Sequence, residues 1–249
     1  MERITSRRNE KIIHMKKLGA DSAYRRACGE FLCDGRKLFS EAVMHGLEIT
    51  AALIGEKNRS EIPENIPVFS VPDELLDHVS PLKTAQDIVF SCRIPQKTDT
   101  DIRGTIVVLD GLQNPGNLGT VIRTANAFRI DTVLLTGQCA DLYNPKTVRA
   151  SMGAVFRQNV VEINTDGLIS LKQRGMKLYG AALTETACDI REVSFENAAF
   201  VIGSEGSGIS EAVLDLCDKY VIIPMAPECE SLNAAAAAAV IMWEMSGKK

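Results

Sequence analysis

The chain has 249 residues, which suits two modest domains or one large one, and its apolar and charged fractions of 45% and 24% are ordinary for a soluble globular protein. No apolar run approaches the roughly 20 residues that cross a bilayer, and the basic N-terminus lacks the apolar stretch of a signal peptide. Seven cysteines, with no C-x-x-C pair among them, favour reduced thiols in a cytoplasmic protein over a disulfide framework or a zinc site.

The distribution of charge says more than the net charge of −4, which by itself argues mildly against a nucleic-acid partner. Residues 1–40 hold ten Lys and Arg side chains against five acids, so the rest of the chain is strongly acidic. This asymmetry fits a phosphate-contacting arm on an acidic body, and it fits a solvated helical face equally well.

Helices and strands alternate over the first hundred residues. The patterning predicts helices over residues 2–20 and 21–28, a strand over Glu30–Cys33 and a helix over Arg36–His45. A strand over 49–55, a short helix over 73–80 and a strand over 88–94 follow. We therefore expect a small α/β domain over residues 1–98, ended by a polar linker at 95–104.

The second part, residues 104–249, shows a cleaner alternation of strands and helices. Its short apolar runs, mostly rich in β-branched residues, predict buried parallel strands at 105–110, 131–136, 158–163, 177–183, 198–204 and 219–225. Helices are expected at 117–128, 144–152, 166–175 and 210–217, and from 231 onward. The expected fold is an α/β domain with one open parallel sheet and helices on both of its faces. In such sheets ligands bind beyond the carboxyl ends of the strands.

Three loops at such strand ends carry the polar residues of interest. In VVLDGLQNPGNLGTVIRTANAFRID, Asn117 is a good helix N-cap and Arg123 follows in the second turn, although a capped helix with a solvated arginine has the same pattern. In FVIGSEGSGIS the glycines allow close approach of a ligand to the backbone near Glu205. Their spacing is neither that of a dinucleotide site nor that of a P-loop, and a flexible turn with an exposed acid remains an alternative.

The third loop is PMAPECESLNAAAAAAVIMWEMSG, in which a polar lead of Glu230, Ser231 and Asn233 precedes six alanines. Ser231 is a plausible N-cap, and the amides of Leu232 and Asn233 could face a ligand. Small side chains would let this helix lie close to neighbouring backbone. An alanine helix in an ordinary tight core explains the alanines but not the polar lead.

The histidines restrict the chemistry, because His14, His45 and His78 all lie in the first domain. The second domain therefore has no histidine base and no histidine metal ligand, and its carboxylates do not gather into a metal cluster, so no metal is expected. The candidate catalytic residues are polar positioning groups, which suit a reaction whose reactive atom comes from a cofactor: Asn117, Arg123, Glu205, Ser231 and Asn233.

These three loops resemble, in order and spacing, the three motifs of the SpoU (TrmH-like) RNA ribose 2′-O-methyltransferases of the SPOUT superfamily. The matching stretches are NLGTVIRTANAF, IGSEGSGIS and IPM-x-P-x-x-ESLNAAAA, and NPKTVRASMGAVF resembles the segment that the family has between the first two. More loosely, residues 1–98 resemble the RNA substrate-binding domain attached to ribosomal-RNA members.

The resemblance implies a trefoil knot in the second domain, an exception to the rule that chains are not threaded. It implies S-adenosylmethionine as the cofactor, bound at Gly203, Ile223 and Leu232 with Met225 nearby. Because a helix tucked through a loop has backbone on several sides, the implied knot also explains the alanines.

The implied reaction is attack of a ribose 2′-hydroxyl on the activated methyl group. Arg123 matches the family's catalytic arginine, but an arginine is a poor base, so we expect it to orient a phosphate and stabilise the developing alkoxide. Asn117 would hold its loop, Glu205 and Asn233 would position substrate and arginine, and Ser231 would bind nearby. The family works as a homodimer on RNA. Ribosomal RNA is the expected substrate; transfer RNA and a non-catalytic RNA-binding knot protein are the alternatives.

Overall fold

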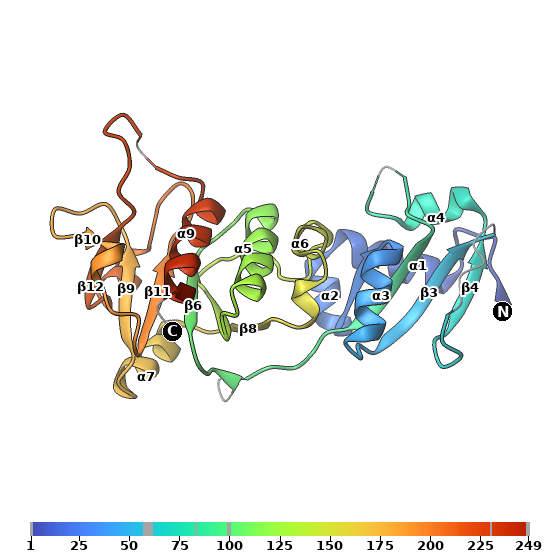
Figure 1. The fold of residues 1–249 in the computed structure, drawn as a ribbon. Helices are drawn as coiled ribbons and strands as arrows, with labels where there is room; N and C mark the ends of the chain where they lie inside the picture. Colours follow the sequence, from blue (N-terminus) through green and yellow to red (C-terminus); the bar gives the residue numbers. More distant parts are fainter. Residues whose placement is uncertain (1, 57–61, 83, 99–100, 230, 248–249) are drawn as a thin grey trace. The chain divides into compact units, whose positions relative to one another are not determined.

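The computed structural model describes residues 2–56, 62–82, 84–98, 101–229 and 231–247 (Figure 1). The chain forms two compact units. The first unit comprises Met1–Gln96 together with Asp141–Phe156, and the second comprises Lys97–Ala140 together with Arg157–Lys249. The expected division into residues 1–98 and 104–249 therefore differs from the structure at one internal segment, residues 141–156, which packs with the first unit.

The first unit is built on a five-stranded sheet in the order β1-β4-β3-β5-β2. Its strands are β1 (Glu2–Arg3), β2 (Glu30–Asp34), β3 (Ile49–Gly55), β4 (Val68–Val71) and β5 (Ile88–Arg93). β1, β4 and β3 run parallel to one another, whereas β5 is antiparallel to both β3 and β2. Its helices are α1 (Glu10–Ala20), α2 (Ser22–Cys28), α3 (Arg36–Met44), α4 (Asp73–Val79) and α6 (Pro145–Ser151).

The first helix is shorter than predicted, because residues 2–20 divide between a strand and a helix. The side chain of Asn9 caps α1 by accepting a hydrogen bond from the Lys11 amide. Before this cap, β1 pairs with β4, and the Ile4 amide donates to the Ser70 carbonyl at 2.9 Å. The partner strand lies more than sixty residues away, so local periodicity could not reveal it.

The segment 141–156 joins the first unit through buried side chains. The ring of Phe31 packs against the rings of Tyr143 and Phe156, at centroid distances of 4.6 and 6.2 Å. Arg25, which is only 2% exposed, donates from Nε to Asp141 Oδ2 at 2.9 Å. α6 packs against β2. These contacts place the segment in the first unit, although it stands between two strands of the second in sequence.

The second unit contains a seven-stranded sheet in the order β10-β12-β9-β11-β6-β7-β8. Its strands are β6 (Ile106–Asp110), β7 (Thr132–Thr136), β8 (Asn159–Glu162), β9 (Lys177–Ala181), β10 (Cys188–Asp189), β11 (Ala198–Ile202) and β12 (Lys219–Ile222). All neighbouring strands pair in parallel, which confirms the predicted parallel α/β sheet. The short edge strand β10 was not predicted.

Helices cover both faces of this sheet, as expected (Figure 1). They are α5 (Pro115–Ala127), α7 (Thr165–Gln173), α8 (Glu211–Leu214) and α9 (Ala234–Gly247). Side chains of α7 and α8 pack on Ile106, Val108 and Val201, which alternate along their strands and so point to one face. α9 packs against α5 and against β11.

Three strands end two or three residues earlier than predicted, and all three shortened ends lie at the carboxyl edge of the sheet. β9 ends at Ala181 instead of 183, β11 at Ile202 instead of 204, and β12 at Ile222 instead of 225. Beyond β12 the chain reaches Pro224, which has no N–H to donate to a neighbouring strand. The residues that follow β11 and β12 belong to loops of the candidate site.

The described residues contain no helix long and apolar enough to span a bilayer. Nor do the described side chains form any group of three or more His, Cys, Asp or Glu residues that could hold a metal ion.

Candidate active site

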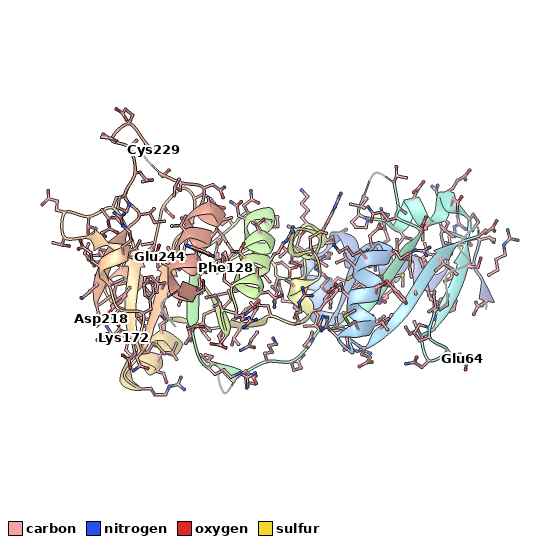
Figure 2. All side chains as sticks on the ribbon, viewed as in Figure 1. Glu64, Phe128, Lys172, Asp218, Cys229 and Glu244 are labelled. Atoms are coloured by element: carbon pink, nitrogen blue, oxygen red, sulfur yellow. The ribbon has the colours of Figure 1, made fainter. Side chains whose placement is uncertain are left out.

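The candidate site is formed by loops that leave the carboxyl ends of β6, β11 and β12. In the sheet, β6 lies next to β11, and β9 lies between β11 and β12. All four strands are parallel, so their carboxyl ends lie along one edge of the sheet. The loop after β12 is long, and Figure 2 shows Cys229 near its tip. Glu230 lies outside the described residues.

Three of the predicted catalytic side chains form a continuous hydrogen-bonded group. Asn117 donates from Nδ2 to Glu205 Oε1 at 2.6 Å, and its Oδ1 accepts from Asn233 Nδ2 at 3.4 Å. One residue comes from each loop, and they are separated by 88 and 116 positions in sequence. We name Asn117, Glu205 and Asn233 the polar triad. The structure thus brings together one predicted residue from each of the three motifs.

The helix caps beside the triad differ from those predicted. Asn114, and not Asn117, caps α5: its Oδ1 accepts from the amides of Gly116 and Asn117, and Pro115 follows at the first helical position. This arrangement leaves the Asn117 side chain available for the triad. In the third loop Asn233, and not Ser231, accepts from the first helical amides, those of Ala235 and Ala236.

Gly203 lies where the loop after β11 folds back on itself. Ser204 and Gly208 exchange two backbone hydrogen bonds, at 2.9 and 3.1 Å. A Cβ atom on Gly203 would lie 2.0 Å from the carbonyl carbon of Gly208 and 2.2 Å from the amide nitrogen of Ile209. Glycine is therefore required here so that the loop can approach its own backbone, in addition to the closeness to a ligand that we expected.

The other predicted residues take no part in the hydrogen bonds that join the described side chains of the triad. Arg123 is an exposed residue of α5 and, among the residues that the structure describes, makes no hydrogen bond or ion pair with the triad. Ser231 is exposed, and its carbonyl accepts from Cys229 Sγ at 3.5 Å. Ile223 and Met225 are half-buried in the loop after β12, and Leu232 is 38% exposed. The side chains of Ile223, Met225 and Leu232 offer apolar surface, and the main chain beside them is in neither a helix nor a strand. This combination suits the binding of a nucleoside.

Asp110, the last residue of β6, is a site residue that sequence reasoning missed. It is only 4% exposed, and its Oδ2 accepts from the Ser210 amide at 2.7 Å, which fastens the end of the glycine loop to β6. A carboxylate directly after the apolar run IVVL was the available signal, since a buried acid needs a specific partner.

Two thiols of this unit, Cys139 and Cys217, are poorly suited to nucleophilic chemistry. Burial raises the pKa of Cys139, and burial raises the pKa of Cys217 to about 11. Both thiols are therefore protonated near neutral pH and are poor nucleophiles. Around the triad the site supplies amides, the carboxylate of Glu205 and the guanidinium of Arg123, groups that position a substrate for a transfer reaction.

Comparison with known families identifies the unit that carries this site. The model of the SpoU rRNA Methylase family matches residues 104–243, a range that includes every residue of the polar triad and Arg123.

The chain belongs to the SpoU rRNA methylase family. Membership confirms the family to which the three motifs pointed, and it makes the chain an RNA-methylating enzyme.

Full-length relatives in this family extend the likeness to the first unit. The 23S rRNA (guanosine(2553)-2′-O)-methyltransferase RlmP of Bacillus subtilis is 32% identical over 250 residues, covering 99% of this chain and 100% of that protein. The crystal structure of the SpoU methyltransferase AviRb from Streptomyces viridochromogenes, in complex with the cofactor AdoMet, superposes with a TM-score of 0.88 at 28% identity. That superposition covers 97% of this chain and 98% of AviRb.

A structure that concerns methylation of tRNA matches less of the chain. A protein whose structure concerns 2′-hydroxyl methylation of C/U34 on tRNA is 26% identical with a TM-score of 0.52. The match covers 95% of that protein but only 58% of this chain. RlmP and AviRb thus match nearly the whole of this SpoU family member, whereas the tRNA-related protein matches only 58% of it.

Proposed function

We propose that this chain transfers a methyl group from S-adenosylmethionine to a ribose 2′-hydroxyl of ribosomal RNA. The observation that carries the proposal is the polar triad, which joins all three family motifs at one edge of the parallel sheet. Ribosomal RNA is favoured over transfer RNA because the likeness to rRNA-modifying RlmP extends over 99% of the chain, including the first unit. In this proposal the first unit is the RNA substrate-binding domain.

S-adenosylmethionine binds between the glycine loop and the loop that precedes α9. Gly203, Ile223, Met225 and Leu232 provide this pocket, with the apolar side chains against the adenosine and main-chain groups against its polar atoms. The amide of Leu232 donates no hydrogen bond to other described residues, so it is available to a ligand. When bound, the cofactor supplies an electrophilic methyl group on a sulfonium.

Arg123 is the residue that acts on the RNA. Its guanidinium stays protonated in water and cannot serve as an efficient base. It orients the phosphate next to the target ribose and stabilises the negative charge that develops on the 2′-oxygen, while the proton leaves to solvent. An exposed position on α5, without a competing carboxylate among its described neighbours, suits this role.

The polar triad positions the loops around this reaction. Asn117 holds α5, and with it Arg123, next to the glycine loop through its hydrogen bond to Glu205. Asn233 ties the start of α9 to the same point and caps that helix. Ser231, exposed two residues earlier, contacts the RNA or the cofactor from the mouth of the loop.

The last segment of the second unit forms a trefoil knot. In support, α9 does not stay beside β12, the strand that precedes it. It packs against β11 and α5, elements nearer the middle of the sheet. In the first half of the closing helix the buried residues are alanines, at 234, 235 and 238, which suits close approach of neighbouring backbone, and the larger buried side chains follow only from Ile241 onward.

The active enzyme is a cytoplasmic homodimer that pairs through α5 and α9. Trp243 is 62% exposed, and its ring makes an edge contact at 5.6 Å with Phe128, whose place beside α9 Figure 2 shows. Val240, one turn earlier on α9, is also exposed. An exposed tryptophan with apolar neighbours is typical of an interface. All seven cysteines are free, which suits a reducing compartment.

A methylation map tests the proposal. Ribosomal RNA from cells with and without the protein is compared at nucleotide resolution, and the purified protein is given S-adenosylmethionine labelled in the methyl group. We expect one ribose methyl to disappear with the gene and to be restored in vitro. Labelling of transfer RNA alone would assign the substrate to the other class, and no labelling of any RNA would overturn the proposal.

A further inference from the structure

Asp110 ends the strand β6 with a buried carboxylate that the proposed chemistry does not use. The residue is only 4% exposed and follows four apolar residues of the strand. Burying a carboxylate costs free energy unless the group is hydrogen-bonded. Its Oδ2 accepts from the Ser210 amide at 2.7 Å, a bond that joins residues 100 positions apart. The bond to Ser210 is therefore what this acid provides at the end of an apolar strand.

Asp110 stands beside the predicted cofactor residue Gly203. Leu109 of β6 pairs with Ile202 of β11, so the residues that follow them, Asp110 and Gly203, leave the sheet side by side. Gly203 begins the glycine loop, residues 203–210, and the side chain of Asp110 reaches the last residue of the same loop. One residue of β6 is thus next to both ends of the loop.

The glycine loop is held at three places. Its two arms exchange the backbone hydrogen bonds of Ser204 and Gly208, and Glu205 near its tip accepts from Asn117. Asp110 supplies the third contact, where the loop passes into α8. Among the hydrogen bonds of the described residues, it is the one that joins this end of the loop to β6.

The space for the carboxylate comes from a glycine in the neighbouring strand-end loop. Gly137 follows β7 with a φ of 65°, and a Cβ atom there would lie 2.9 Å from Asp110 Oδ1. The Gly111 amide donates to the Thr136 carbonyl at 3.0 Å, which holds the loops after β6 and β7 together. The carboxylate is therefore enclosed on one side and bonded to the glycine loop on the other, so its surroundings fix its direction.

We propose that Asp110 is a positioning residue for the cofactor, which holds the glycine loop in the shape that binds S-adenosylmethionine. This inference rests on the proposed function and adds to it a residue that acts through the Ser210 amide. A ligand held by main-chain groups depends on the shape of the loop that carries them. A loop already in its bound shape gives a higher affinity than one that must be ordered during binding.

The first test changes the carboxylate in the full-length protein and measures cofactor affinity by calorimetry. Asp110→Ala should weaken binding of S-adenosylmethionine about tenfold to a hundredfold, which corresponds to one hydrogen bond to a charged group. Asp110→Asn keeps an acceptor oxygen, and since a neutral bond is weaker, the loss should be about threefold to tenfold. At saturating cofactor, kcat on ribosomal RNA should stay within about threefold of the wild type, while KM for the cofactor rises.

The second test removes the other partner of the same bond. Ser210 has a φ of −64° and a ψ of 149°, values that proline adopts. Ser210→Pro therefore removes the N–H, while the carbonyl of this residue can still accept from the Val213 amide. Alone, it should weaken cofactor binding as Asp110→Ala does. Added to Asp110→Ala, it should weaken binding by no more than about twofold, because both changes break one bond.

Asp34→Ala is the matched control for burial. Asp34 is also a buried aspartate at a strand end, and its Oδ1 accepts from the Gln86 amide at 3.0 Å, but it belongs to the first unit. The change should lower the free energy of unfolding in urea and leave the affinity for S-adenosylmethionine within about twofold.

S-adenosylhomocysteine separates loop shape from direct charge, because it lacks the methyl group and the positive charge on sulfur. Asp110→Ala should weaken the binding of both ligands by the same factor, since the loop is the same for both. A loss confined to S-adenosylmethionine would make the carboxylate a direct counterion of the sulfonium and would overturn the positioning role.

The remaining outcomes separate this inference from the proposed function. Wild-type affinity in Asp110→Ala, additive losses in the double variant, or an equal loss in Asp34→Ala overturns the inference, even if the wild-type enzyme methylates ribosomal RNA. If Asp110→Ala does not fold, Asp110→Asn and Ser210→Pro decide the question by the same measurements. A wild-type protein that binds no S-adenosylmethionine overturns the proposed function as well.

Discussion

Arg123 and the polar triad carry separate parts of the proposed chemistry. The triad is held by hydrogen bonds that the protein makes with itself, so it acts on loop position. Arg123 projects from α5 without an ion pair among the described residues, so it can meet an anionic substrate. This separation predicts different effects of substitution at the two places.

Changing Arg123 to Ala should reduce methyl transfer by about 10²–10³-fold, the usual effect of removing one group that stabilises developing charge. Affinity for S-adenosylmethionine should stay nearly unchanged, because the predicted cofactor residues lie in other loops. Single-turnover methyl transfer and calorimetry measure the two quantities. A parallel decrease in both would show that Arg123 maintains the pocket instead of acting on the RNA.

Changing Gly203 to Ala should abolish cofactor binding, since the new Cβ would lie 2.0 Å from the Gly208 carbonyl carbon. Overpacking of this kind typically costs about 1–3 kcal/mol. Gly206→Ala is the matched control in the same loop, because a Cβ there meets no atom within 4 Å. For the control, as for the wild type, cofactor at about 100 times its Kd should stabilise folding by about 2.7 kcal/mol. The same stabilisation of Gly203→Ala would contradict the assigned role.

The helix α9 has buried residues that pack within the second unit and exposed apolar residues that are available to a partner. Its buried alanines at 234, 235 and 238 allow close packing near α5 and β11, while Val240 and Trp243 remain exposed. A helix that only closed a core would not need an exposed tryptophan. The proposed dimer gives that side chain a partner.

Trp243→Lys should convert the protein to a monomer and lower methyl transfer, because a charge at the centre of an apolar interface lacks compensation. Sedimentation at micromolar concentration measures the association state. Ile169→Lys is the control: this side chain of α7 is also apolar and 36% exposed, but it lies outside the proposed interface. A Trp243→Lys protein that remains a dimer would exclude the α5 and α9 pairing.

Across the molecule, the first unit depends on a segment from the middle of the chain. Deleting residues 1–96 would therefore remove the Phe31 partner of Tyr143 and Phe156 as well as the proposed RNA-binding domain. A point substitution tests the packing of residues 141–156 on the rest of the first unit with less disruption. Arg25 and Asp141 are suited to this test because they are 116 positions apart, and because the side chain of Arg25 is only 3% exposed and that of Asp141 17%.

Asp141→Ala should destabilise the protein by about 3–5 kcal/mol, the usual cost of leaving a buried charge without its partner. Arg25 keeps one hydrogen bond, to the Leu18 carbonyl, but no longer has a carboxylate partner. Urea denaturation measures the change. Glu56→Ala breaks the exposed pair with Arg3 and should cost no more than about 1 kcal/mol. Equal effects of the two substitutions would show that the buried pair does not fasten the segment.

Local sequence patterns predicted most elements but misplaced their ends. The apolar runs located all the longer strands of the second unit because a buried parallel strand needs little besides apolar side chains. The helix starts at Asn117 and Ser231 were wrong, since Asn114 and Asn233 make the capping hydrogen bonds. Several Asn and Ser residues near each start could cap equally well, and only the three-dimensional positions of the amides decide between them.

The sequence alone determined the α/β class, the parallel sheet and the family, because these follow from periodicity and from motifs that are contiguous along the chain. It also named all three residues of the polar triad. Tertiary structure decided that they touch, that Asp110 fastens the glycine loop, and that residues 141–156 pack with the first unit. The physical reason is that these contacts join positions far apart in sequence, and such contacts leave no local pattern.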